Sequence, residues 1–337
     1  MNTNHDLHNI RLTASEVSEL WMTYLNNSAS KCVLSYFKNK TVDGDIRAIV
    51  EFALEMSEMH LNAISNVFKT INHPLPYGFK DKDVNVNAEK LFSDEFMLFY
   101  LKHMARFSFS NYGEALSVCA REDVRAFFTN CLQSTIQLSN KTDDLLLSKG
   151  LYVRAPYIDV PERTEFVHKQ SYIHGLLGDK RPINASEITQ IYINMQTNYI
   201  GKAFAMGLSQ TIKDDRVRDF ILRGKEIAEK HVAVFSEMLK MEDLPAPMSH
   251  DSDVLGSTEP PFSDSLIMFH FTGLNAFSIA LYANSMVKIM RTDILASFAR
   301  LSAEITQYAK DGIDIMIDNE WLEKTPEKVS HEVLISK

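Results

Sequence analysis

Residues 55–60 and 226–231 carry the same pattern of glutamates and histidine, and this duplication constrains the fold more than any other feature of the chain. The first copy reads Glu-Met-Ser-Glu-Met-His and the second reads Glu-Ile-Ala-Glu-Lys-His. Each copy lies in a long segment whose apolar residues recur at intervals of three and four, which is typical of an amphipathic helix. Each is also followed, at the same distance, by Pro-x-Pro. The sequence therefore predicts two copies of one helical module.

The duplication extends over most of the chain. Residues 12–76 align with 183–247 without a gap, and residues 92–123 align with 262–293. We therefore predict a first module over residues 1–156 and a second over residues 183–337. The segment between them, residues 157–182, is interpreted as a linker because prolines and glycines interrupt it.

Each module contains four helical segments, and the middle two are joined by a long connection over residues 73–91 or 244–261. Connections of this length without regular structure are uncommon in compact domains. The length is explained if the second and third helices run parallel, because a helix of about 25 residues is about 37 Å long and the connection must cross that distance. The sequence therefore predicts an all-α fold of two tandem ferritin-like four-helix bundles.

Composition limits the classes of function. The net charge of -9 disfavours nucleic-acid binding, which requires a basic surface. The three cysteines are odd in number and lack C-x-x-C spacing, which fits buried thiols in a reducing compartment. No signal peptide and no run of about 18 apolar residues is evident, so we expect cytoplasmic synthesis and no membrane span.

The duplicated histidines could belong to a polar core or to a metal site. His60 and His231 lie on the apolar stripe of the second helix of each module, and Asn27 and Asn198 lie near the stripe of the first helix. Because buried polar groups require partners, we predict that each histidine is hydrogen-bonded to the asparagine or to a neighbouring tyrosine. The pattern of ligands that di-iron bundles use is absent, because Glu226 and His231 are about 140° apart around a helix.

A metal site in the second module is the alternative. His270 shares a helical stripe with apolar residues, and Glu304 lies between Leu301 and Tyr308 on the fourth helix. His231, His270 and Glu304 could therefore converge from three helices, with Glu226 or Asn198 at the margin. Two histidines and a carboxylate suit Fe, Mn or Zn. The first module has Tyr100 and Ser134 at the corresponding positions, which are poor ligands, and His103, one turn further on, leaves a weaker site with His60 as an alternative.

Several motifs resemble those of a family found in spore-forming bacteria. Three of these motifs lie at predicted helix starts, residues 12–16, 92–94 and 260–264. The others lie at residues 96–104, 145–151, 178–182 and 222–228. Members of that family resemble tandem ferritin-like bundles and are described as spore coat proteins by similarity to the coat F family. The resemblance implies a fold and a spore association, with no catalytic residues to transfer.

These observations give three expectations about function. The first is a structural protein without catalytic activity that assembles on the spore coat with other coat proteins or with its own copies. The second is a metal-binding bundle protein, with redox activity, that uses the second module. The third is a bundle that binds a small molecule.

Overall fold

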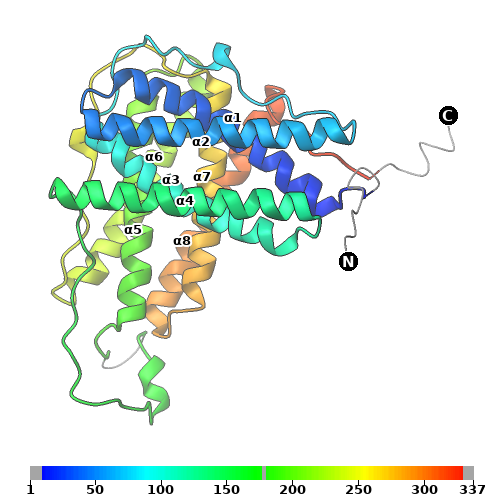
Figure 1. Cartoon of the computed structure of the whole chain (residues 1–337). Helices are drawn as coiled ribbons and strands as arrows, with labels where there is room; N and C mark the ends of the chain where they lie inside the picture. The colour runs from blue at the N-terminus through cyan, green and yellow to red at the C-terminus, as the bar shows by residue number, and fades with distance from the viewer. Residues whose placement is uncertain (1–9, 177–179, 329–337) are drawn as a thin grey trace.

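The computed structural model describes residues 10–176 and 180–328, and within these ranges it contains eight α-helices and no β-strand (Figure 1). The first four helices are α1 (Ala14–Lys40), α2 (Gly44–Thr70), α3 (Asp94–Val118) and α4 (Glu122–Ser148). The second four are α5 (Ala185–Ser209), α6 (Asp215–Lys240), α7 (Asp264–Met286) and α8 (Thr292–Asp318). The all-helical prediction is confirmed. Residues 177–179 of the predicted linker lie outside the described ranges.

The helix starts follow from capping residues in the sequence. Thr13 begins α1 and forms a reciprocal capping box with Glu16, and Asn184 forms the same box with Glu187 at the start of α5. Ser93 and Ser263 cap α3 and α7, each accepting a backbone N–H from the residue three positions later. Because these caps recur at matching positions, the two halves share helix starts as well as sequence.

Two buried carboxylates establish how the helices run in the first half. Glu16, at the start of α1, accepts the backbone N–H groups of Ala120 and Arg121, at the start of α4. Asp94, at the start of α3, accepts those of Val42 and Asp43, at the start of α2. Helices α2 and α3 therefore begin at the same end and run parallel, so the connection between them crosses the length of the bundle.

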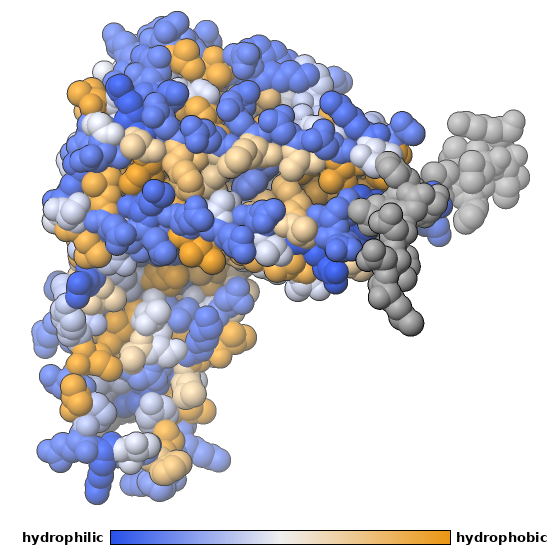
Figure 2. Space-filling model, viewed as in Figure 1, coloured by the Kyte–Doolittle hydropathy of each residue, from blue (hydrophilic) through white to orange (hydrophobic). Residues whose placement is uncertain are grey.

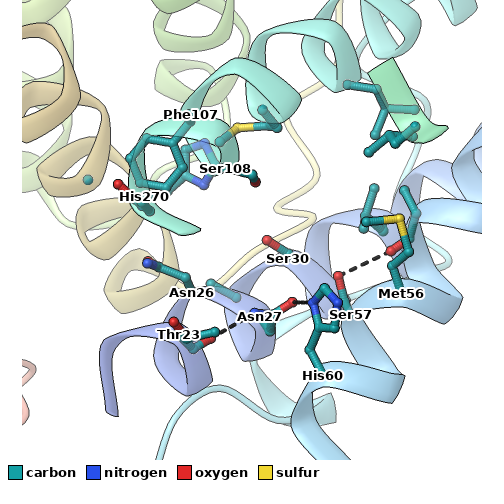
Figure 3. A pocket seen from close by; sticks show the side chains of 18 of the residues that line it. Thr23, Asn26, Asn27, Ser30, Met56, Ser57, His60, Phe107, Ser108 and His270 are labelled. Atoms are coloured by element: carbon teal, nitrogen blue, oxygen red, sulfur yellow. Dashed lines mark hydrogen bonds between the residues drawn. The ribbon is translucent and has the colours of Figure 1, made fainter. Parts of the chain in front are cut away.

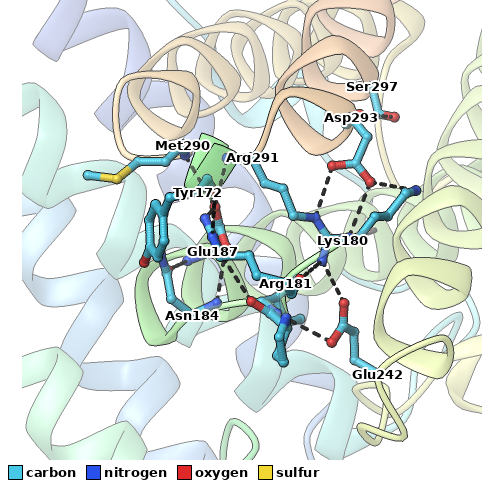
Figure 4. A network of polar contacts seen from close by, with 12 residues as sticks. Tyr172, Lys180, Arg181, Asn184, Glu187, Glu242, Met290, Arg291, Asp293 and Ser297 are labelled. Carbon is cyan, nitrogen blue, oxygen red and sulfur yellow. Dashed lines mark hydrogen bonds and ion pairs between the residues drawn. The ribbon is translucent and has the colours of Figure 1, made fainter. Parts of the chain in front are cut away.

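The second half repeats this arrangement. Glu187 accepts the backbone N–H of Arg291 at 2.9 Å, and Asp264 accepts that of Asp214 at 3.2 Å. Figure 4 shows the polar network around Glu187, in which Arg181 pairs with that carboxylate and Arg291 pairs with Glu242 and Asp293. Arg291 is only 1% exposed, so the network closes one end of the second half.

The two long connections pair with each other at the junction between the halves. Ser93 donates its backbone N–H to the carbonyl of Asp253 and its hydroxyl to the Asp253 carboxylate. Ser263 makes the same two bonds to Asp83. We call these segments, residues 80–93 and 250–263, the crossover loops. Because equivalent residues exchange equivalent bonds, the junction has an approximate twofold symmetry inside one chain. The helices of the two halves cross steeply around it (Figure 1).

Helix α7 is apolar around most of its circumference because it is packed on two sides. By length and composition it is the one helix among the described residues that could cross a membrane. In this structure it packs against α5 and α8 within its own half, and Phe277 contacts Phe107 and His103 of the other half. Its apolar character is therefore accounted for by these contacts. Elsewhere, polar side chains cover most of the face in Figure 2, with an apolar band between α2 and α4.

Candidate functional site

A chain of polar side chains crosses the interior of the second half. The Asn198 amide donates to the Tyr282 hydroxyl at 2.9 Å, and that hydroxyl lies 2.8 Å from Nδ1 of His231. Nε2 of His231 lies 3.3 Å from Oε2 of Glu304. Since the carboxylate can only accept, His231 carries its proton on Nε2 and the Tyr282 hydroxyl donates to Nδ1. Every member of the chain therefore has a partner.

The electrostatics of this chain keep His231 neutral. His231 is fully buried, and burial lowers its pKa to about 4, although the hydrogen bond to Glu304 opposes the shift. Glu304 lies at the rim and also accepts two hydrogen bonds from Lys230, at 2.8 and 2.9 Å. Burial raises the pKa of Glu304, but the bonds from Lys230 and His231 outweigh it and hold that pKa below its usual value.

The first half contains the related set with a different proton arrangement. Asn27 donates to the Tyr112 hydroxyl at 3.3 Å, and its carboxamide oxygen lies 3.1 Å from Nδ1 of His60. Because that oxygen can only accept, His60 carries its proton on Nδ1, whereas His231 carries it on Nε2. Ser134 replaces Glu304 and lies 3.5 Å from Nε2 of His60. Burial lowers the pKa of His60 to about 4, so this ring is neutral too.

The structure brings together two of the four ligands considered for a metal. His231 and Glu304 meet, but His270 lies at the junction, where its Nε2 is 3.3 Å from the Tyr100 hydroxyl of the other half. Glu226 is exposed on α6. Within the described residues, no group of three or more histidine, cysteine, aspartate or glutamate side chains could hold a metal ion.

The sequence did not predict a cavity that lies where the first half meets α7 of the second. Figure 3 shows this cavity between α1, α2, α3 and α7. It has a volume of about 100 Å³, enough for several water molecules or a small polar molecule. Its lining offers hydroxyl, amide and neutral imidazole groups, and no acidic side chain. The polar lining residues include Thr23, Asn26, Asn27, Ser30, Ser57, His60, Ser108 and His270.

The equivalent space in the second half is largely filled. It measures about 40 Å³, because Tyr308 replaces Leu138 and stacks on Phe220 with ring centroids 4.2 Å apart. Gly224, which aligns with Ala53, makes room for that ring, since a Cβ there would lie 2.2 Å from the Tyr308 hydroxyl. The signal in the sequence was the pair of exchanges between the halves, Leu138 for Tyr308 and Ala53 for Gly224.

Replacing Tyr282 with phenylalanine tests the hydrogen-bonded chain. The substitution leaves the Asn198 amide and Nδ1 of His231 without their buried partner, so we expect the free energy of unfolding to fall by about 1–3 kcal/mol. Urea denaturation of the variant and the unaltered chain measures the change. Tyr157, which is 79% exposed, provides the control, and its phenylalanine variant is expected to be unchanged. Equal stability of all three proteins would contradict the role assigned to Tyr282.

The fold defines a class of protein, the all-helical proteins built of two repeats. The comparisons with known proteins agree. The chain belongs to the family described as "Protein of unknown function (DUF3231)", whose pattern matches residues 2–163 and 171–334. The match occurs twice, once on each half of the chain.

Among solved structures, the chain is similar to a crystal structure from Bacillus halodurans described as a "putative spore coat protein". The two are 19% identical, with a TM-score of 0.42, and the match covers 46% of this chain and 100% of the other. Among proteins with curated descriptions, none matches this chain.

Proposed function

We propose that the chain is a structural protein of the spore coat, built of two ferritin-like four-helix bundles, residues 1–156 and 183–337, joined by residues 157–182. Three features support the bundle assignment: α2 and α3 run parallel, α1 packs on α2 and α3, and α4 packs on the same two helices. This order of packing is the one that a single long crossover requires. The spore assignment rests on the motifs that resemble the spore-former family, such as those at residues 92–94 and 260–264.

The observation that carries the structural role is the pairing of the two crossover loops. Reciprocal hydrogen bonds between Ser93 and Asp253 and between Ser263 and Asp83 join the bundles into one block. The duplicated histidines, His60 and His231, are each hydrogen-bonded to neighbouring side chains of their own bundle, which suits a building unit. The proposed protein is made in the cytoplasm and assembles with other coat proteins or with further copies of itself.

Fractionation of spores tests this proposal. A tagged copy expressed in its own sporulating host is expected in the alkaline detergent extract of purified spores, from which a cytosolic marker enzyme is absent. A variant carrying Asp83→Ala and Asp253→Ala removes both carboxylates from the junction and is expected to be depleted from that extract. Recovery of the unaltered chain only with the cytosolic marker would overturn the proposal.

The contact between His231 and Glu304 supports a second candidate, a metal-binding bundle that takes Fe, Mn or Zn. Lys230 competes for the same carboxylate, at 2.8 Å. Metal analysis of protein purified without added metal decides between the two. Near-stoichiometric metal that is lost in His231→Ala would favour this candidate over the structural role. A loss of about 1–3 kcal/mol of stability in His231→Ala, with no metal present, would favour the hydrogen-bonded core.

A further inference from the structure

A second cavity, of about 50 Å³, lies where the two bundles, the segment after α4 and the second crossover region meet. Helix α3 contributes the basic residues of its wall, and α5 contributes Gln196 and Ile200. Because its walls come from both bundles, one bundle alone cannot form it. The remaining lining is mostly apolar and consists of Phe99, Leu146, Tyr152, Val153, Pro247, Met248 and His250.

Two polar side chains of this cavity are not satisfied by the protein. Arg106 is partly buried and forms no ion pair with any described residue, and its Nη2 donates to the side-chain oxygen of Gln196 at 3.2 Å. His103 is 4% exposed, and its buried Nε2 has no hydrogen-bond partner among the described residues. A charge that is partly removed from water and has no counter-ion is destabilising. The site is therefore one that an anion would stabilise.

The charge balance indicates how much negative charge fits. Lys102, the third basic residue, is paired with Asp143 and lies 4.0 Å above the ring of Tyr152. None of the lining residues is acidic. One positive charge, that of Arg106, therefore remains without a partner, and a monoanion would neutralise it. A dianion such as inorganic phosphate would carry a second charge into mostly apolar walls.

The three basic residues of the cavity wall are not repeated in the second half. Thr272, Gly273 and Ala276 occupy the positions of α7 that correspond to Lys102, His103 and Arg106. Residues that are the same in both halves, such as those at the helix caps, stabilise the bundle that each half forms. The three basic residues occur in one half only and line a cavity that needs both halves, so bundle stability does not explain them.

We propose that this cavity binds a small monocarboxylate with an apolar tail. The planar guanidinium of Arg106 matches a carboxylate with two parallel N–H donors, and His103 donates a further hydrogen bond. The tail follows Phe99 and Ile200 toward the cavity mouth, where Val153 and Met248 are 40% and 44% exposed. Binding there would hold the two bundles together at a second point besides the paired crossover loops.

Calorimetric titration of the whole chain with hexanoate tests the proposal. Saturable one-to-one binding is expected, and Arg106→Gln is expected to raise the Kd at least tenfold. Arg223→Gln is the matched control, because Arg223 is also an arginine on a helix but pairs with Asp311 at the surface. Its Kd should equal that of the unaltered chain. Hexanamide, which keeps the shape but lacks the charge, is expected to bind at least tenfold more weakly.

Three results would overturn the proposal: hexanoate that does not saturate, equal Kd values for the unaltered chain and a folded Arg106→Gln, or equal binding of hexanoate and hexanamide. Displacement of hexanoate by equimolar inorganic phosphate would replace the carboxylate assignment with a phosphate site. Circular dichroism establishes whether Arg106→Gln is folded. If it is not, the comparison of hexanoate with hexanamide on the unaltered chain decides the question alone. None of these outcomes depends on whether the protein reaches the spore coat.

Discussion

Replacing Arg291 with alanine is expected to lower the free energy of unfolding by about 3–5 kcal/mol, because it removes one partner from a buried ionic network. The guanidinium, 1% exposed, donates to Glu242 at 2.6 Å and to Asp293 at 2.9 Å. It also donates to the carbonyl of Arg181 at 2.8 Å. The variant would leave the mostly buried Glu242 without its cation, and Asp293 with Lys180 alone. Urea denaturation monitored by circular dichroism measures the loss.

Arg223→Ala is the control for this prediction. Its ion pair with Asp311 lies at the surface, with side chains 46% and 36% exposed, and pairs of this kind contribute about 0–1 kcal/mol. We therefore expect Arg291→Ala to cost several times more than Arg223→Ala. Equal losses in the two variants would show that the network around Arg291 does not stabilise the second bundle.

Lowering the pH from 7.5 to 5 is expected to cost about 8 kcal/mol of stability. Burial lowers the pKa of His60, His231 and His270 to about 4 and that of His103 to about 3, from about 6.5 in an exposed histidine. Between these values the unfolded chain binds protons that the folded chain does not, so stability falls as the pH falls below about 6.5. At pH 5 each of the four histidines contributes a loss of about 2 kcal/mol.

Urea titrations at pH 7.5 and 5 measure this dependence. In His231→Gln the difference in stability between the two pH values should shrink by about a quarter, because one of the four groups no longer titrates. Glu187 acts only at lower pH: burial raises its pKa, but the hydrogen bonds from Arg181 and the backbone outweigh this and hold it below its usual value. Its contribution is lost below about pH 4.5. Equal stability at pH 7.5 and 5 would contradict the burial of neutral histidines.

The helices could be predicted from the sequence because their signals are local. Capping residues such as Thr13 and Ser93 mark the starts, and the intervals of the apolar residues place His60 and His231 toward the interior. The length of the connection before Ser93 indicated that α2 and α3 run parallel. Each of these inferences needs only the chemistry of a few neighbouring residues, which is why it succeeded.

Contacts between the halves could not be predicted in the same way. His270 lies on a helix that is apolar around most of its surface, so its periodicity does not say which neighbour it faces, and it meets Tyr100 rather than His231. Pairing of the crossover loops depends on Asp83 and Asp253, which lie in polar stretches of sequence that are typical of solvent-exposed turns. The cavity around Arg106 likewise arises from packing between segments that are distant in sequence.

The pairing of the crossover loops also has a consequence for synthesis of the chain. Ser93 and Leu91 of the first loop bond to Asp253 and Leu255, which the ribosome adds more than 150 residues later. At about 5–20 residues per second, the first bundle therefore waits roughly 8–30 s with its loop unpaired. During that interval its exposed loop could pair with the same loop of a neighbouring nascent chain. Translation speed between the two repeats should therefore influence how much of the protein is recovered as single chains rather than exchanged dimers.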